Sequence, residues 1–297
     1  MAPIHAPNAR ALIVTADDFG LSTRVNEAVE IARRDGILST ASLMVGAPAV
    51  DDAVRRAREL PKLGVGLHVT LLDGRPVLPP SEIPGLVGPN GRFFTDPVRF
   101  GMALYFSSEL RAQARAEIEA QFQRFRETGL ELDHINGHKH FHLHPVVLET
   151  ILRLAPSFGS PPIRVPFEPF APSFEANRDR ALGRLTSACF YLLQTRRLTR
   201  KLKRAGIAGN DYVFGLNDSG AMTEQRLLKL IEHLPSSGVT EFYCHPATNR
   251  WDGADTLPAD YRPEEEFHAL ISPAVKAKLR ACKLEPQDFR AACGVEA

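Results

Sequence analysis

Short apolar segments rich in β-branched residues alternate along the chain with longer segments in which apolar residues recur at helical spacing. In residues 108–129, for example, Leu110, Ala114, Ile118 and Phe122 fall on one face of a predicted helix. Strands that alternate with helices are typical of a parallel sheet. The pattern predicts an α/β fold, either an irregular or incomplete (β/α) barrel or, as the alternative, an open doubly wound sheet. About seven strands are predicted, at 11–15, 40–45, 63–69, 130–136, 162–166, 211–214 and 239–244.

Two segments interrupt the alternation. Residues 72–106 are rich in proline and have little regular pattern before Phe100, which is typical of a long functional loop. Residues 181–206 predict a long helix with apolar positions in its first half and a basic cluster after them, formed by Arg196, Arg197, Arg200, Lys201, Lys203 and Arg204. We therefore interpret residues 1–297 as a single domain with insertions at about 72–106 and 170–210.

Composition narrows the class of protein. Among 297 residues, 44% are hydrophobic and 24% charged, and the formal net charge of +1 gives no global signal for a nucleic-acid partner. The four cysteines lack CxxC spacing, which favours reduced thiols and a cytoplasmic protein. The N-terminal residues show no leader pattern, and no apolar run is long enough to span a membrane. We expect a cytoplasmic protein that can still contact the inner face of the cytoplasmic membrane.

A histidine-rich segment, HINGHKHFHLHP, covers residues 134–145. Gly137 permits a sharp turn, and Pro145 suits the first position of a helix that continues to Leu154. The strand is therefore expected to end near Gly137, with the histidines in a loop before the helix. Only one or two of them can then face a given site. His140, His142 and His144 are expected to make hydrogen bonds or contact substrate rather than bind metal.

Metal-ligand side chains follow four predicted strands, at Asp17 and Asp18, His68, His138 and His245. Because the carboxyl ends of parallel strands meet at one mouth, these groups are expected to converge there. Two imidazoles and one carboxylate leave coordination positions open, which is typical of a catalytic metal site. Zn²⁺ suits this mixed nitrogen and oxygen set, with Mg²⁺ or another divalent ion as the alternative.

The adjacent pair Asp17 and Asp18 cannot share one face of a regular strand. A turn at the strand end would let one aspartate bind a metal while the other approaches its water from the side. The structural alternative for this pair is a helix cap or a turn. The three histidines at other strand ends favour the functional interpretation.

Four segments resemble, in the same order, the YdjC-like carbohydrate deacetylase family: TADDFGL at 15–21, GLHVTL at 66–71, HINGHKHFHLHP, and FYCHPA at 242–247. The resemblance covers most of residues 10–285. Within the family, TADDFGLS, ASLMVGAPA, GRPVLPPSEIPGLV and GHKHFHLHP are most similar to deacetylases associated with hopanoid biosynthesis.

The resemblance implies an irregular TIM-like barrel and one divalent metal ion bound by Asp18, His68 and His138. It also implies that Asp17 is the general base and His245 the acid. Similar family members carry SHHHVH where this chain has GHKHFH, so that Lys139 replaces a histidine. Arg164, His140 and Asn136 are candidates for orienting these groups or binding substrate.

The expected reaction is removal of the acetyl group from an N-acetyl amino sugar, carried by a glycosylated hopanoid lipid. The alternatives are a deacetylase of soluble chito-oligosaccharides and a non-catalytic sugar- or lipid-binding protein. With a lipid substrate, the basic helix 181–206 and the apolar segment 100–106 would contact an anionic membrane. Otherwise the helix is a packed element with a solvated basic end. The oligomeric state is left open.

Overall fold

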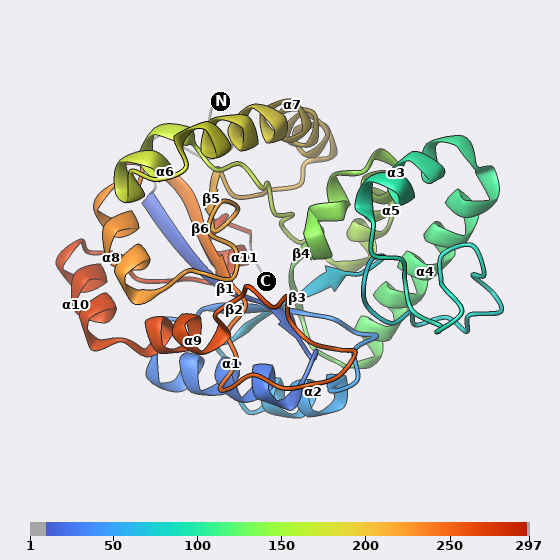
Figure 1. The fold of residues 1–297 in the computed structure, drawn as a ribbon, viewed down its shortest axis with the longest axis horizontal. Coiled ribbons are helices and arrows are strands. Elements are labelled where there is room, and N and C mark those ends of the chain that lie inside the picture. The colour runs from blue at the N-terminus through green and yellow to red at the C-terminus, as the bar shows by residue number, and fades with distance from the viewer. Residues whose placement is uncertain (1–9, 296–297) are drawn as a thin grey trace.

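The computed structural model describes residues 10–295 and contains one parallel sheet surrounded by helices (Figure 1). The sheet has six strands in the order β4-β3-β2-β1-β6-β5. The predicted α/β class and parallel sheet are confirmed, whereas the predicted strand number of about seven is wrong. The strands are β1 (Arg10–Phe19), β2 (Thr40–Leu43), β3 (Gly64–Val69), β4 (Leu132–Gly137), β5 (Tyr212–Phe214) and β6 (Gly238–Cys244).

The remaining predicted strand, 162–166, lies in segment 162–167, which runs between β4 and β5 without forming a regular ladder. On one side Ile135 N donates to Pro162 O and Arg164 N donates to Ile135 O. On the other side Val213 N donates to Phe167 O. Ladder pairing is interrupted because prolines such as Pro162 and Pro166 have no N–H to donate.

Around the curved sheet, the strands follow one another in the order in which they occur along the chain. β1 to β4 are neighbours in sequence order, segment 162–167 comes next, and β5 and β6 return to β1. This succession is typical of a (β/α) barrel, whereas a doubly wound sheet reverses its strand order at a switch point. The six named strands form a half-barrel, and the irregular segment occupies the gap between its edges.

Helices cover the outside of the sheet, and on one side a further group of helices extends beyond it (Figure 1). The histidine-rich segment forms a short 3-10 helix, η1 (His138–Leu143), directly after β4, as expected for a strand that ends near Gly137. A second 3-10 helix, η2, covers Ala155–Phe158. The α-helices are α1 (Thr23–Asp35), α2 (Val50–Arg58), α3 (Pro97–Phe106), α4 (Ser108–Glu127), α5 (Pro145–Leu154), α6 (Phe170–Asn177), α7 (Ala181–Ala205), α8 (Glu224–Glu232), α9 (Pro263–Ile271), α10 (Pro273–Ala281) and α11 (Phe289–Ala292).

Both predicted insertions lie beside the barrel. Residues 72–106 form an extended loop that ends in α3, and residues 170–210 contain α6 and the long predicted helix α7. No helix within residues 10–295 is long and apolar enough to cross a membrane. The prediction of a single domain stays a prediction. Residues 1–9, on which the expected absence of a leader partly depends, lie outside the described part.

Candidate metal centre and active-site cavity

Asp17 and Asp18 leave the regular strand at the carboxyl end of β1. The register between β1 and β2 shifts between Ala16 and Phe19, and Asp18 has a left-handed φ of 61°. Such a conformation is uncommon for a residue with a side chain and marks a local bulge. The bulge lets both carboxylates face the same region, as the sequence analysis expected of a turn at this position.

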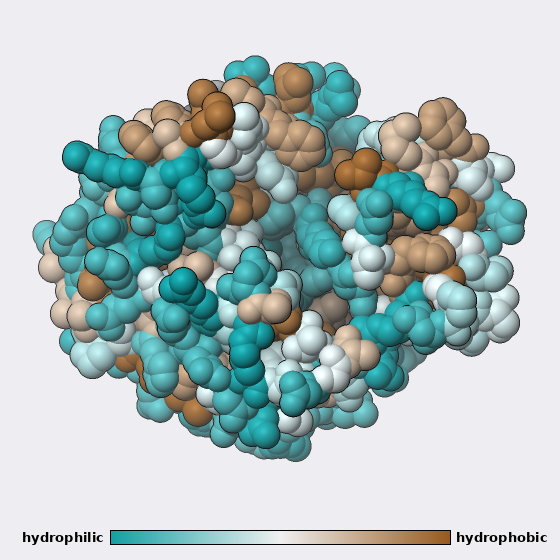
Figure 2. Space-filling view, in the orientation of Figure 1, coloured by the Kyte–Doolittle hydropathy of each residue, from teal (hydrophilic) through white to brown (hydrophobic). Residues whose placement is uncertain are grey.

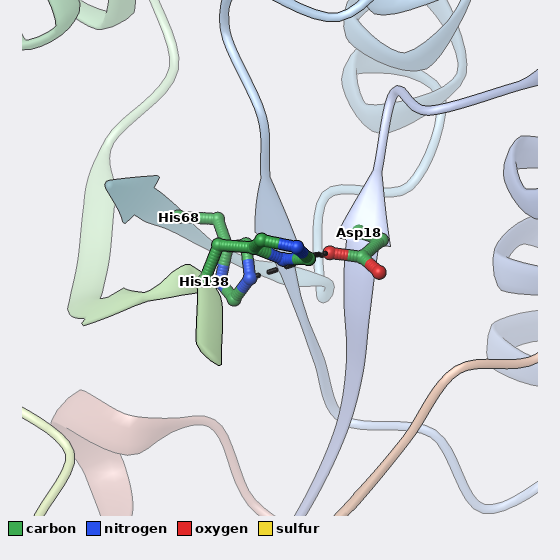
Figure 3. Close-up of side chains that lie close together, drawn as sticks. All are labelled: Asp18, His68 and His138. Carbon is green, nitrogen blue, oxygen red and sulfur yellow. Dashed lines mark hydrogen bonds and ion pairs between the residues drawn. The ribbon is translucent and has the colours of Figure 1, made fainter. Parts of the chain in front are cut away.

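Asp18, His68 and His138 meet at the ends of three strands (Figure 3). Asp18 Oδ1 lies 3.0 Å from His138 Nδ1 and 3.3 Å from His68 Nε2. One ligand atom from each residue lies within 4.8 Å of the other two. The three residues predicted as metal ligands are therefore neighbours, although they are far apart in sequence. Their one oxygen and two nitrogens match the ligand set of an open divalent metal site.

Asn136 fixes the orientation of His68. Its amide nitrogen donates to Asp17 Oδ1 at 3.2 Å, and because a carboxylate oxygen can only accept, this contact sets which end of the amide is oxygen. The amide oxygen lies 2.6 Å from His68 Nδ1 and must accept a hydrogen from it. In the neutral ring, the form that binds a metal, His68 Nε2 then carries the lone pair, and it faces Asp18. This arrangement fits a divalent ion, since a ligating histidine usually donates from its other ring nitrogen.

Burial and neighbouring charges shift the pKa values of Asp18 and His68 in opposite directions. Burial would raise the pKa of Asp18, but His138 and His68 outweigh it and hold the pKa well below its usual range. Burial would lower the pKa of His68, but Asp17 and Asp18 outweigh it and raise the pKa. Asp18 is therefore ionised, as a metal ligand must be.

Arg164 connects Asp17 to a second buried acid, Glu241. Its guanidinium donates to Asp17 Oδ2 at 2.6 Å and Oδ1 at 3.0 Å, and its Nε donates to Glu241 Oε2 at 2.9 Å. Burial would raise the pKa of Asp17, but the charge of Arg164 outweighs it and lowers the pKa strongly. The fork of Arg164 thus fixes both oxygens of an ionised Asp17 beside the metal-ligand cluster.

His245 follows β6 and lies on the same rim. Its backbone N–H donates to Glu266 Oε2 at 2.6 Å, and its ring packs against Tyr261 with centroids 4.9 Å apart. Among the described residues, no hydrogen-bond partner reaches its buried Nδ1. Burial lowers the pKa of His245.

The remaining histidines of the run have separate roles in packing. His142 is buried and its Nε2 donates to Arg164 O at 3.0 Å, while His144 accepts from Val146 N at the start of α5. His140 has a left-handed φ of 54° and lies 3.2 Å from the Tyr243 hydroxyl. None of the three joins the metal-ligand cluster found within residues 10–295. Lys139, next to His140, forms an ion pair with Asp73.

A cavity of about 700 Å³ opens over the cluster and is lined by Asp17, Asp18, His68, His138 and His245. Sequence reasoning missed three tyrosines in its wall, Tyr191 of α7, Tyr243 of β6 and Tyr261. It also missed Glu241, although a charged residue inside the otherwise apolar strand 239–244 is a signal that could have found it. Arg164 and Asn136, both predicted as orienting or substrate-binding residues, lie behind Asp17 and make contact with it.

Comparisons with known proteins agree with this arrangement. The model of the YdjC-like protein family matches residues 11–281. A carbohydrate deacetylase of Geobacillus stearothermophilus is 32% identical over 91% of this chain and 93% of its own, and one of Mus musculus is 31% identical over 90% of each. A chitooligosaccharide deacetylase of Salmonella paratyphi B is 38% identical over 50% of this chain and 57% of its own.

Among solved structures, a proposed cellobiose-phosphate cleavage protein of Enterococcus faecalis V583 covers 96% of this chain and 99% of its own, with a TM-score of 0.70 and 23% identity. At that identity the likeness concerns the fold alone. The match to the family model extends across nearly the whole barrel and includes all four strand ends that form the cavity. The chain belongs to the YdjC-like protein family.

Proposed function

We propose that this protein is a metal-dependent carbohydrate N-deacetylase. The observation that carries the proposal is the convergence of Asp18, His68 and His138 beside Asp17, whose two oxygens are held by Arg164. The curated relatives named carbohydrate deacetylases support it, because they match over about nine tenths of the chain. An amide hydrolase needs an electrophile, a proton acceptor and a proton donor, and the cavity offers residues for each.

A divalent ion held by Asp18, His68 and His138, with Zn²⁺ preferred and Mg²⁺ or another ion as the alternative, would polarise the acetyl carbonyl and acidify a water. Asp17 accepts the proton of the attacking water, and Arg164 and Asn136 keep its carboxylate aimed at that water. His245, in its protonated form, gives a proton to the amine as the C–N bond breaks. The products are acetate and a free amino sugar.

The substrate we propose is an N-acetylglucosaminyl hopanoid lipid, processed in the cytoplasm by an enzyme in peripheral contact with the membrane. Its support is the similarity of four sequence segments to deacetylases associated with hopanoid biosynthesis, together with exposed apolar residues near the cavity. The alternative is a soluble chito-oligosaccharide, which is favoured by the name of the Salmonella relative. In both cases the reactive group is an N-acetyl amino sugar, and His140 is a candidate for contacting its hydroxyl groups.

A non-catalytic binding protein on the same scaffold is a further alternative. A binding site for sugar or lipid would not need an open metal-ligand set beside an ionised, precisely oriented carboxylate. The presence of Asp17, Asp18, His68, His138 and His245 in one cavity therefore favours an enzyme.

The direct test is mass spectrometry after incubation with N-acetylglucosaminyl bacteriohopanetetrol or with N,N′-diacetylchitobiose, each with and without a chelator. We expect loss of one acetyl group from the hopanoid and no loss when metal is removed. Loss from the chitobiose alone would retain the chemistry and overturn the lipid substrate. No loss from either by metal-loaded protein would favour the binding protein.

A further inference from the structure

Exposed large hydrophobic side chains are concentrated in the two insertions. Within residues 10–295, nine such side chains are exposed, and every one of them belongs to residues 94–106 or to α7. The most exposed is Phe106, at 81%. Exposed apolar side chains scattered singly are ordinary, whereas their confinement to two segments indicates a binding surface. The nine are Phe94, Val98, Met102, Tyr105, Phe106, Leu182, Leu185, Phe190 and Leu193.

The outward face of α7 changes character along the helix. At about 100° per residue, Leu182, Leu185, Phe190 and Leu193 fall on one side of the axis, opposite the buried Arg184, Leu198 and Leu202. The same outward side continues after Leu193 with five exposed cations, Arg196, Arg197, Arg200, Lys203 and Arg204. Lys201 is turned away and pairs with Glu149 at 3.2 Å. One face is therefore apolar in its first half and cationic in its second.

The active-site cavity is bordered by α7 and by the segment that leads into α3. Tyr191 of α7 lines the cavity, and its neighbour Phe190 is exposed outside it. On the other side, Thr95 lines the cavity just before α3 begins. The first half of α3 packs against η1, where the rings of Phe100 and Phe141 stack with centroids 5.3 Å apart. Figure 2 shows hydrophobic residues gathered over α7 and around α3, with the more polar central hollow between them.

We propose that the exposed faces of α7 and α3 bind an anionic lipid membrane, with the cavity mouth between them directed at the lipid headgroups. The apolar half of α7 and the exposed end of α3 would enter the interface, and the cations of α7 would pair with lipid phosphates. The inference deepens the proposed function, on which it rests for the nature of the substrate. It names the surface through which a lipid-linked sugar reaches the metal-ligand cluster.

The charge of this surface favours an anionic membrane over a second copy of the chain as its binding partner. The chain has a formal net charge of only +1, so five exposed cations on one helix face are a local concentration. Two copies of the chain joined through α7 in parallel would bring these cations together, which is unfavourable. An anionic lipid surface satisfies the cationic and apolar halves together.

Membrane binding can be measured without deacetylation. The test can therefore be interpreted even if the proposed reaction does not occur. We would sediment the metal-loaded protein with phosphatidylcholine vesicles that contain or lack phosphatidylglycerol. The expected result is binding that requires phosphatidylglycerol and weakens as salt rises. Arg197→Gln with Arg200→Gln should weaken binding roughly twenty-fivefold, at about fivefold for each cation removed. Lys229→Gln, at an exposed position of α8, is the matched control and should bind normally.

The apolar contribution has its own variants. Leu182→Gln with Leu193→Gln in α7, and Met102→Gln with Phe106→Gln in α3, replace exposed side chains by a residue that favours helices. Each pair should weaken vesicle binding roughly tenfold. Each should leave deacetylation of a soluble N-acetyl sugar unchanged and slow that of the same sugar on a vesicle-bound lipid.

Cys189 offers a direct reporter, because it is exposed and lies on the same side of α7 as Leu182 and Leu193. In a Cys282→Ser background, a polarity-sensitive fluorophore on Cys189 should shift to shorter wavelength when anionic vesicles are added. A fluorophore placed through Lys229→Cys, with Cys189→Ser and Cys282→Ser, should not shift. Absence of vesicle binding by the unmodified protein, or binding that the α7 and α3 variants do not alter, would overturn the proposal. Concentration-dependent dimerisation abolished by these same variants would assign the surface to a second copy instead.

Discussion

Within residues 10–295 two arginines are almost fully buried, each paired with at least two carboxylates, yet they occupy different parts of the fold. Arg164 binds Asp17 and Glu241 inside the barrel, and Asp17 faces the cavity. Arg184, near the start of α7, binds Asp218 and Asp179, and these acids are also bonded by arginines from outside the barrel. The first cluster orients the carboxylate that we propose as the general base, whereas the second attaches an inserted helix to the loop 215–220. A buried ion pair is therefore no evidence of catalysis unless one partner faces the site.

The largest difference between the clusters should appear when one carboxylate of each is neutralised. Asp17→Asn keeps the shape but removes the proton acceptor, so kcat should fall by about a thousandfold while metal content stays near normal. Asp218→Asn should lower stability and leave kcat within about threefold, because Asp218 does not line the cavity. Metal analysis and steady-state kinetics on both variants check this prediction. Normal activity of Asp17→Asn would refute the role of Asp17 as general base.

Removal of a metal ligand should give a different signature from removal of the base. His68→Ala deletes the nitrogen that faces Asp18 and should lose both bound metal and activity. Metal content after dialysis, measured by atomic emission, separates it from Asp17→Asn. Retention of a full equivalent of metal by His68→Ala would show that the ion is bound elsewhere.

A smaller effect is expected from replacing each arginine by lysine, which keeps the charge but loses the planar fork. Arg164→Lys should reduce kcat by about a hundredfold, since a misplaced carboxylate alone can cost that much. Arg184→Lys should destabilise the fold by about 1–3 kcal/mol and change kcat by less than about threefold. Urea unfolding beside kcat tests the pair. If both variants lost activity equally, the distinction between an orienting and an attaching arginine would be wrong.

The metal-ligand cluster was predictable because strand ends in a parallel sheet converge whatever lies between them. Strand assignment alone predicted that Asp17, Asp18, His68, His138 and His245 would converge. The resemblance to the YdjC-like family then selected Asp18, His68 and His138 as the candidate ligands. Glu241 could not be paired with Arg164 in the same way, because Glu241 lies in the middle of β6 and segment 162–167 is no regular strand. Two of the cavity tyrosines, Tyr191 and Tyr261, depend on how α7 and the 254–261 loop pack over the barrel. That packing is set by long-range contacts such as Arg92 with Asp255, which no local pattern encodes.

The last expected effect, on the pH dependence of stability, concerns Glu266. It accepts from His245 N and Met222 N, and within residues 10–295 no arginine side chain pairs with it to offset burial. Burial raises its pKa to about 7 from an ordinary value of 4.5. Between these values the folded carboxyl keeps its proton while the unfolded one has lost it. The unfolded state therefore binds fewer protons, and stability should fall as pH rises through this window, by up to about 1.4 kcal/mol per pH unit.

Glu266→Gln cannot ionise and should remove this slope, although it loses one of the two accepted hydrogen bonds. We would measure unfolding free energies by urea titration at several values between about pH 5 and pH 7 and subtract the variant from the unmodified protein, which cancels the other titrating groups. The unfolding free energy of the unmodified protein, relative to that of Glu266→Gln, should decrease as pH rises. A difference independent of pH would mean that the two backbone donors stabilise the carboxylate enough to keep it ionised, and Glu266 would then resemble Asp17, an acid held charged by its hydrogen-bond donors.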